Sequence, residues 1–163
     1  MPYHKNAHCS YCGHPFEARQ AWPRTCANCG QTSFLNPLPV AILLLPVDNG
    51  LLVVRREIPP QQGWLALPGG FINFDETWQA AAARELFEET GVTITPADIR
   101  DFCTLSGREG YILVFGVGPA LTAADLPPFE PNEEASERLV ITGPTDLAFP
   151  THTEAAARFF QKR

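Results

Sequence analysis

Short apolar runs separated by turn residues recur along the chain after residue 37. The runs are rich in branched and aromatic side chains and are short, which is typical of β-strands. Asp48-Asn49-Gly50 is a turn signal between the first two runs and predicts that they pair as a hairpin. We predict strands over these ranges: 40–47, 51–56, 92–95, 99–105, 111–117 and 139–142.

Two segments carry helical signals instead of the strand pattern. In the first, Asp75 or Thr77 can cap the start, and Gly91 can supply the left-handed residue that ends the helix. The second opens on a capping-box pattern at 151–154, ahead of a helix over 155–161. Strands interleaved with two helices predict an α/β fold.

The first helix gathers three carboxylates on one side. Glu85, Glu88 and Glu89 stand at i, i+3 and i+4, so they are near neighbours on one face. Like charges at this spacing repel, and the helix dipole disfavours anions near the C-terminus. A hard cation such as Mg2+ would offset this repulsion and still bind phosphate oxygens. We expect the opposite side to be the buried one: Ala80, Ala83 and Phe87, with Leu86 at its flank.

A cluster of acidic residues is, by itself, more often a solvated surface than a metal site. Here the glycine-rich segment Leu67-Pro68-Gly69-Gly70 leads towards the helix. Glycines without a Cβ allow the backbone to come close to a ligand. The two features together favour a metal site over a solvated face.

The segment also carries a family pattern. It reads, at fixed spacing, Gly70, Glu76, Arg84-Glu85-Leu86, Glu88-Glu89 and Gly91-Val92. This pattern resembles the Nudix box, the signature of enzymes that cleave nucleoside diphosphates linked to another group. The resemblance implies hydrolysis of a phosphoanhydride. It also implies that residues 37–163 form an α/β/α sandwich, with a mixed β-sheet between helices.

The same resemblance implies roles for individual residues. Mg2+ (or Mn2+) would be bound by Glu85, Glu88, Glu89 and the carbonyl of Gly70. Arg84 precedes Glu88 by four residues, so we expect it to orient these carboxylates by hydrogen bonding.

The general base is either a glutamate of the box or one from a later loop. Glu133, Glu134 and Glu137 are the late candidates. Glu137 enters the strand at 139 in a position resembling one that often faces the metals in the family, and a solvated loop acid is the alternative.

Substrate contacts are sought among aromatic and basic residues. Trp64, Phe74, Trp78 and Tyr111 could stack on a base, with ordinary packing as the alternative for each. Arg55, or its neighbour Arg56, ends the second strand near the expected cleft and could meet a phosphate.

The N-terminal region carries a second set of metal-binding residues. Cys9 and Cys12 form one Cys-x2-Cys pair, and Cys26 and Cys29 form another. Four thiolates suit tetrahedral Zn2+, and the glycine after each pair permits a tight turn. The arrangement resembles a zinc ribbon over residues 1–36. Since four cysteines fill the coordination sphere, we expect a structural role.

Two disulfides, or reduced cysteines without metal, are the alternatives to zinc. Residues 1–7 lack the apolar core of a signal peptide, so we expect a reducing, cytoplasmic compartment in which zinc is favoured. Cys103 lies in an apolar run and is expected to be a buried thiol.

Composition narrows the range of partners. The net charge of −6 argues against a broad electrostatic grip on nucleic acid, and the ribbon region carries only Lys5, Arg19 and Arg24 as basic residues. The apolar run at 40–45 is too short to cross a membrane. We therefore expect a small-molecule nucleotide derivative as partner and no nucleic acid or membrane; a homodimer is plausible because many family members pair.

Three functions remain open at this point. The first is a Nudix pyrophosphohydrolase acting on a compound such as NADH, FAD or ADP-ribose. A zinc ribbon before a Nudix domain resembles the NADH pyrophosphatases, but residues 104–110 stand where those enzymes carry a motif that marks dinucleotide substrates. The second is a nucleotide-sensing module without turnover. The third is an RNA cap-type hydrolase guided by the ribbon.

Overall fold

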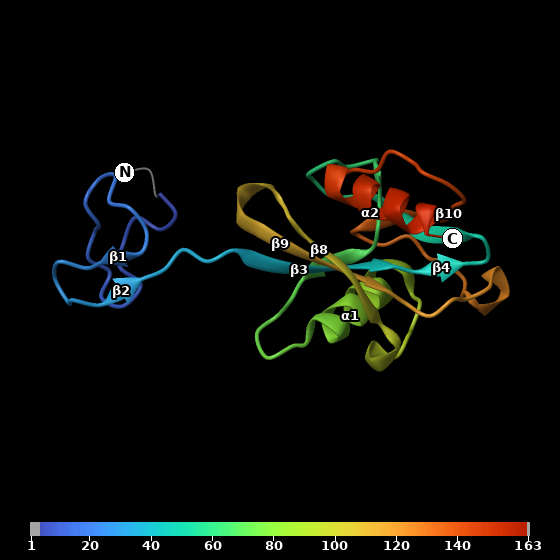
Figure 1. Ribbon diagram of the computed structural model, residues 1–163, viewed down its shortest axis with the longest axis horizontal. Helices are drawn as coiled ribbons and strands as arrows, with labels where there is room; N and C mark the ends of the chain where they lie inside the picture. The colour runs from blue at the N-terminus through green and yellow to red at the C-terminus, as the bar shows by residue number, and fades with distance from the viewer. Residues whose placement is uncertain (1–3, 163) are drawn as a thin grey trace. The chain divides into compact units, whose positions relative to one another are not determined.

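The computed structural model describes residues 4–162, which divide into two compact units. The first unit ends at Pro37 and the second begins at Leu38. The first contains one small antiparallel sheet, formed by β1 (Arg24–Thr25) and β2 (Thr32–Ser33). The second carries the remaining strands and both α-helices (Figure 1).

Two four-stranded sheets form the centre of the second unit. The first has the order β7-β3-β9-β8, and it is mixed because β3 and β9 run parallel. Its strands are β3 (Leu38–Leu44), β7 (Gly69–Phe71), β8 (Arg100–Ser106) and β9 (Tyr111–Val117). In the second sheet, β5 pairs with three strands. These strands are β4 (Pro46–Val47), β5 (Gly50–Arg56), β6 (Leu65–Ala66) and β10 (Ala135–Ile141).

A helix covers each side of these strands. Figure 1 shows α2 (Pro150–Gln161) on one side of the strands and α1 (Trp78–Thr90) on the other. Three short 3-10 helices lie in the loops: η1 (Pro96–Asp98), η2 (Arg108–Gly110) and η3 (Ala123–Asp125). The expected α/β/α sandwich with a mixed sheet is confirmed. No helix of the described residues is long and apolar enough to cross a membrane.

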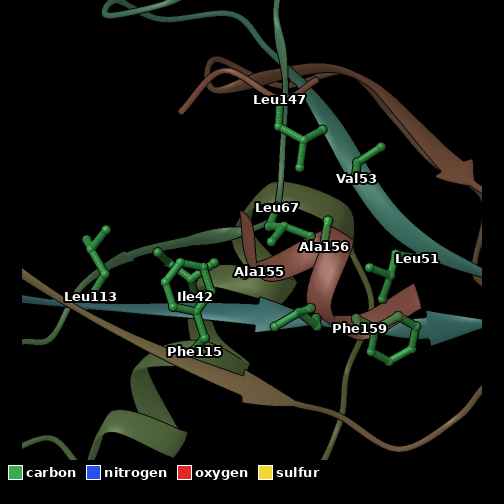
Figure 2. Close-up of a cluster of buried hydrophobic side chains, with 11 residues drawn as sticks. Ile42, Leu51, Val53, Leu67, Leu113, Phe115, Leu147, Ala155, Ala156 and Phe159 are labelled. Atoms are coloured by element: carbon green, nitrogen blue, oxygen red, sulfur yellow. The ribbon is translucent and has the colours of Figure 1, made fainter. Parts of the chain in front are cut away.

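Strand β3 separates two hydrophobic cores, which explains why its sequence is almost continuously apolar. Ile42 and Leu44 point to the core under α2, where Phe115 and Phe159 also lie (Figure 2). The alternate residues point to the core under α1: Ala41, Leu43 and Leu45. Both faces of the strand are therefore buried.

The predicted strand over 40–47 is two strands in different sheets. The chain leaves the first sheet at Leu44 and joins the second at Pro46, where β4 and β5 form the expected hairpin around Asp48-Asn49-Gly50. Leu45 lies between them and accepts a hydrogen bond from the N–H of Leu52. A continuous apolar run does not reveal this change of sheet, because both environments are buried.

Helix α1 begins and ends as predicted but buries the other side. Thr77 caps its start by accepting from the N–H of Ala80, and Gly91 ends it with φ 73°. The buried side contains Ala81, Ala82 and Leu86 together with Glu85 and Glu89. The prediction of an apolar side around Phe87 was wrong: that side chain is 56% exposed. Glu85 and Glu89 thus lie on the buried side of α1 and not opposite it.

Two further predictions were wrong. Residues 92–95 form no strand, because the hydroxyl of Thr90 accepts from the N–H of Val92 and the segment runs into η1. Helix α2 begins at Pro150 rather than after a capping box at 151–154, since proline is well suited to the first helical turn. The hydroxyl of Thr153 instead accepts from the N–H of Leu147.

The start of α2 also carries a buried histidine. His152 lies between the rings of Phe115 and Phe149, and its Nδ1 accepts a hydrogen bond of 3.2 Å from the N–H of Leu67. Burial, followed by the nearby positive charge of Arg56, lowers the pKa of His152 from 6.5 to about 3. The imidazole is therefore neutral in the folded protein across the physiological pH range.

This histidine predicts an acid-sensitive contribution to stability. Between pH 6.5 and about 3 the unfolded chain binds a proton at His152 that the folded chain does not, so the stabilisation present above pH 6.5 is lost as the pH falls through this window. Urea unfolding of the wild type and of His152→Asn at several pH values tests this. The wild type should lose stability faster on acidification, by up to about 1.4 kcal/mol per pH unit relative to the variant. Parallel curves would contradict the assignment.

Candidate functional site

Three carboxylates meet on the inner side of α1. Glu85 and Glu89 come from the helix, and Glu134 comes from the loop just before β10. Each offers one oxygen within 4.8 Å of the other two. Glu89 is 6% exposed, whereas Glu134 is exposed, so the cluster runs from the protein interior to the surface.

The glycine-rich segment closes the inner side of this cluster. A Cβ at Gly70 would lie 2.4 Å from the carboxyl carbon of Glu85, and one at Gly69 would lie 2.3 Å from the carbonyl oxygen of Ala41. Any larger residue at these two positions would displace either the carboxylate or the neighbouring strand. The N–H of Gly69 donates to the carboxylate of Glu89. The glycines thus bring backbone groups against the acidic residues.

Glu89 is the group with the most unusual environment. Burial, with the neighbouring charges of Glu85 and Glu134, raises its pKa to about 8. Its Oε2 is buried and has no hydrogen-bond partner among the described residues. A buried carboxylate oxygen without a partner is costly, so a ligand for it is expected. Burial also raises the pKa of Glu85, and Arg84 opposes this shift.

Arg84 joins the acidic residues of the box. Its guanidinium donates to Glu76 (2.9 and 3.1 Å), Glu85 (2.7 Å) and Glu88 (2.9 Å), and to the carbonyl of Phe71 (3.0 Å). These bonds lower the pKa of Glu76. The hydrogen bond expected between Arg84 and Glu88 is present, and Glu76 is a further partner that the spacing along the helix did not indicate.

Two of the predicted acidic residues are not part of the cluster. The carboxylate of Glu88 is half-exposed and is bonded by Arg84. Glu137 pairs with Arg55 at 2.7 Å, in keeping with the register of β5 and β10. Among the three late glutamates it is Glu134 that joins Glu85 and Glu89. Sequence spacing could not separate these candidates, because Glu134 lies in the loop before β10, while a register shift between residues 135 and 137 sets Glu137 opposite Arg55.

The loop that carries Glu134 is fastened to the C-terminal end of α1. The side-chain amide of Asn132 donates to the carbonyls of Glu88 (3.1 Å) and Glu89 (3.4 Å), while its oxygen accepts from the N–H groups of Glu134 and Ala135. Arg138 donates to the carbonyl of Thr90 at 2.7 Å. These bonds satisfy helix carbonyls that would otherwise lack partners and fix the position of Glu134.

The aromatic candidates have different surroundings. Trp64 and Phe74 are exposed, the latter by 95%. Trp78 packs in the core under α1, where its ring lies against Gly116 and is not brought to the carboxylates. Tyr111 pairs with Phe71 (ring centroids 5.8 Å apart), the residue that directly follows the two glycines. Phe71 was not singled out from the sequence, although its place next to Gly70 was a usable signal.

The two arginines proposed as phosphate ligands have different partners. Arg55 is engaged with Glu137 and with the carbonyl of Gly63. Arg56 lies over the ring of Phe149 and donates to the carbonyl of Pro60 at 2.9 Å. Its positive charge also acts on Glu89. Of the two, Arg56 is therefore the one electrostatically linked to the acidic cluster.

In the first unit, the four cysteines come together from two similar turns. The carbonyl of Cys9 accepts from the N–H of Gly13, and the carbonyl of Cys26 accepts from Gly30 in the same way; both glycines have φ above 70°. The Sγ atoms of Cys9 and Cys29 are 3.7 Å apart, as are those of Cys12 and Cys26. Sulfur atoms around tetrahedral zinc lie about 3.8 Å apart, whereas a disulfide bond is about 2 Å long.

Part of this sequence is similar to NudC proteins from two bacteria. The NAD-capped RNA hydrolase NudC of Edwardsiella ictaluri is 37% identical over 87 residues, covering 53% of this chain and 34% of that protein. NudC of Klebsiella pneumoniae (strain 342) is 29% identical over 93 residues, covering 56% and 36%. The aligned region thus spans about a third of the length of these relatives.

Solved structures share the fold. A NUDIX hydrolase from Nitrosomonas europaea has a TM-score of 0.73 at 24% identity and covers 96% of this chain and 91% of its own. A bifunctional NMN adenylyltransferase/ADP ribose pyrophosphatase from Francisella tularensis, complexed with AMP and a manganese ion, has a TM-score of 0.55 at 28% identity, covering 67% and 35%. The family model of the NUDIX domain matches residues 36–162. Because this match spans most of the chain, the protein belongs to the Nudix family.

Proposed function

We propose that this protein is a Nudix pyrophosphohydrolase, dependent on Mg2+ or Mn2+, that cleaves the diphosphate of a nucleoside diphosphate derivative. The observation that carries the proposal is the unpartnered Oε2 of Glu89, buried beside Glu85 and Glu134. Three converging carboxylates with a buried, unsatisfied oxygen are a donor set for a hard divalent cation.

The residues present fit such a cation. Glu85, Glu89 and Glu134 would bind it, with the carbonyl of Gly70 as a backbone ligand; Glu88, held at the rim by Arg84, is the remaining carboxylate of the box. The ion would neutralise phosphate charge and make a bound water more acidic. Since the pKa of Glu89 is raised to about 8, cation binding at neutral pH would displace a proton from it.

Side chains of the protein would provide the general base and keep the carboxylates in position. Glu134 is exposed at the edge of the cluster, so the carboxylate oxygen that does not bind the ion can accept the proton of an attacking water there. Arg84 keeps Glu85 and Glu88 in fixed orientations by charge-assisted hydrogen bonds. Asn132 keeps Glu134 next to the helix end. We therefore assign the general base to Glu134 rather than to Glu137, which is engaged with Arg55.

The substrate class follows from the surroundings of the cluster and from the named relatives. Phe71 and Tyr111 offer aromatic surface directly after the glycine segment, and Trp64 and Phe74 are exposed aromatic residues. Arg56 supplies positive charge for a phosphate group, with Arg55 as the less available alternative. The Francisella neighbour is named for ADP-ribose cleavage and NudC for NAD-capped RNA. A diphosphate linking adenosine to a second group is common to both.

RNA carrying such a cap is a second candidate substrate, favoured by the name of the NudC relatives. It runs against the expectation that no nucleic acid is bound. The first unit contains three basic residues and one acidic residue: Lys5, Arg19, Arg24 and Glu17. Four thiolates with one zinc ion would add two further negative charges. The zinc-loaded unit would thus have no net positive charge, so recognition would depend on the cap itself rather than on the RNA backbone.

We further propose that the first unit is a structural zinc ribbon. The sulfur separations near 3.7 Å and the two matching turns support tetrahedral coordination by Cys9, Cys12, Cys26 and Cys29. The unit has little apolar interior of its own, and a metal ion would compensate for this.

A substrate panel with site variants tests the enzymatic proposal. With Mg2+, the protein should split one of NADH, NAD, FAD, ADP-ribose or NAD-capped RNA into monophosphate products, as resolved by chromatography. Glu89→Gln should lower kcat more than about a hundredfold, because it removes a negative charge from the cluster without changing its shape. Glu134→Gln should lose at least about a hundredfold through loss of the base.

Two control variants accompany the panel. Asp98→Asn changes an exposed acid outside the cluster and should leave turnover within about threefold. Glu137→Gln should also stay close to wild type; a large loss in this variant with normal Glu134→Gln would move the base to Glu137. Ligand binding without turnover by folded wild type, with either cation, would replace the proposal with a nucleotide-sensing function.

Zinc stoichiometry tests the ribbon. Metal analysis of purified protein should find one zinc per chain, and Cys26→Ser should abolish it, because three thiolates bind the ion more weakly. Hydrogen exchange in that variant should become fast in residues 4–37 and stay slow in the second unit. Cys103→Ser is the matched control, since Cys103 lies in β8, and it should retain zinc. Wild type without zinc would refute the assignment.

A further inference from the structure

Helix α2 makes a contact with the glycine segment that the proposed mechanism does not use. We propose that His152 is a positioning residue for the candidate metal site: its Nδ1 fixes the segment from Leu67 to Gly70 that places backbone groups against Glu85 and Glu89. The proposal rests on the proposed function, because it assigns His152 a part in building that metal site.

The segment needs such an anchor because it crosses between the two sheets. β6 belongs to the second sheet and ends at Ala66, while β7 belongs to the first and begins at Gly69. The two residues between them, Leu67 and Pro68, lie outside both strands. Proline has no N–H, and the N–H of Leu67 donates to a side chain, that of His152. The histidine thus stands in for the strand partner that the crossing residue lacks.

Three successive residues of the crossing are each anchored by a different element. His152 of α2 binds the N–H of Leu67 (3.2 Å), and Leu43 of β3 donates to the carbonyl of Pro68 (2.9 Å). Glu89 of α1 accepts from the N–H of Gly69. The contacts of Leu67 and Pro68 fix the position of the glycines, and the contact of Gly69 is made to Glu89, a residue of the candidate site. A change at His152 is therefore passed along the backbone to the carboxylate of Glu89.

The clearances at the site make it sensitive to small displacements. A Cβ at Gly70 would come within 2.4 Å of the Glu85 carboxyl carbon, and a Cβ at Gly69 would come within 2.3 Å of the carbonyl oxygen of Ala41 in β3. A loop shift of a few tenths of an ångström would alter how Gly70 and Glu85 face a common ion. Metal sites respond strongly to loss of the groups that orient their ligands.

The environment of His152 keeps its acceptor available. The ring is held by edge contacts with Phe115 and Phe149, with centroids 5.9 and 5.0 Å away. Phe149 in turn lies under Arg56, whose charge opposes protonation of the imidazole. Nδ1 consequently remains an acceptor throughout the pH range in which the metal site would work.

A pair of substitutions separates positioning from simple packing. His152→Leu removes the acceptor and keeps apolar volume, whereas His152→Asn places an amide oxygen close to the position of Nδ1. Phe160→Leu, on the same helix two turns further on, is the control for loss of packing. The measurements are Mn2+ affinity of the metal-free protein by electron paramagnetic resonance, exchange of the Leu67 amide by NMR, and kcat and KM with the substrate found in the panel, all below the melting range of every variant.

His152→Leu should bind Mn2+ at least about tenfold more weakly, lose protection of the Leu67 amide and lose kcat by about tenfold or more at little changed KM. His152→Asn should restore all three to within about threefold of wild type, and Phe160→Leu should change none of them. Normal Mn2+ affinity in folded His152→Leu would overturn the proposal, as would a folded His152→Asn that fails to restore it. Because Mn2+ affinity and amide exchange need no turnover, they test His152 even if the wild type hydrolyses nothing; wild type that binds no Mn2+ would instead sink the proposed metal site.

Discussion

The structure depends on two carboxylates of like charge placed on the buried side of one helix. Glu85 and Glu89 lie one turn apart on α1, close to its C-terminal end, where neither burial nor the helix dipole favours negative charge. Arg84 stabilises the charge of Glu85 through a direct hydrogen bond, and the N–H of Gly69 partly stabilises that of Glu89. One oxygen of Glu89 remains without a partner. This oxygen is the group that the proposed cation would satisfy.

The rest of the second unit can be understood as support for this arrangement. Because β3 is buried on both faces, it holds α1 on one side and α2 on the other. The glycine segment crosses between the sheets beside the carboxylates and is tied to both helices, to α2 through His152 and to α1 through Glu89. Asn132 ties the Glu134 loop to the end of α1. The groups that would face a cation thus come from α1, from the glycine segment and from the loop before β10, and contacts between these parts hold them together.

The two units obtain their rigidity in different ways. The second has two hydrophobic cores, each with strand and helix residues. The first has one sheet of two strands, each two residues long, and two cysteine turns with the same backbone hydrogen bonds. A small unit of this kind needs a cross-link or a metal ion to stay folded, which agrees with the proposed zinc site and with its lack of a role in the proposed chemistry.

The sequence by itself determined the family pattern, the ends of α1 and most strands, because these depend on local chemistry: a threonine cap, a left-handed glycine, branched side chains and fixed spacing along a helix. It also singled out Glu85, Glu89 and the four cysteines, which the structure brings together in two clusters. Tertiary structure decided what lies far apart in the chain. It buried the charged side of α1, split the run at 40–47 between two sheets, and brought Glu134 rather than Glu137 to the acidic cluster. It also joined His152 to Leu67, 85 residues away. Such pairings depend on which faces the whole fold buries, and no local pattern of residues specifies that.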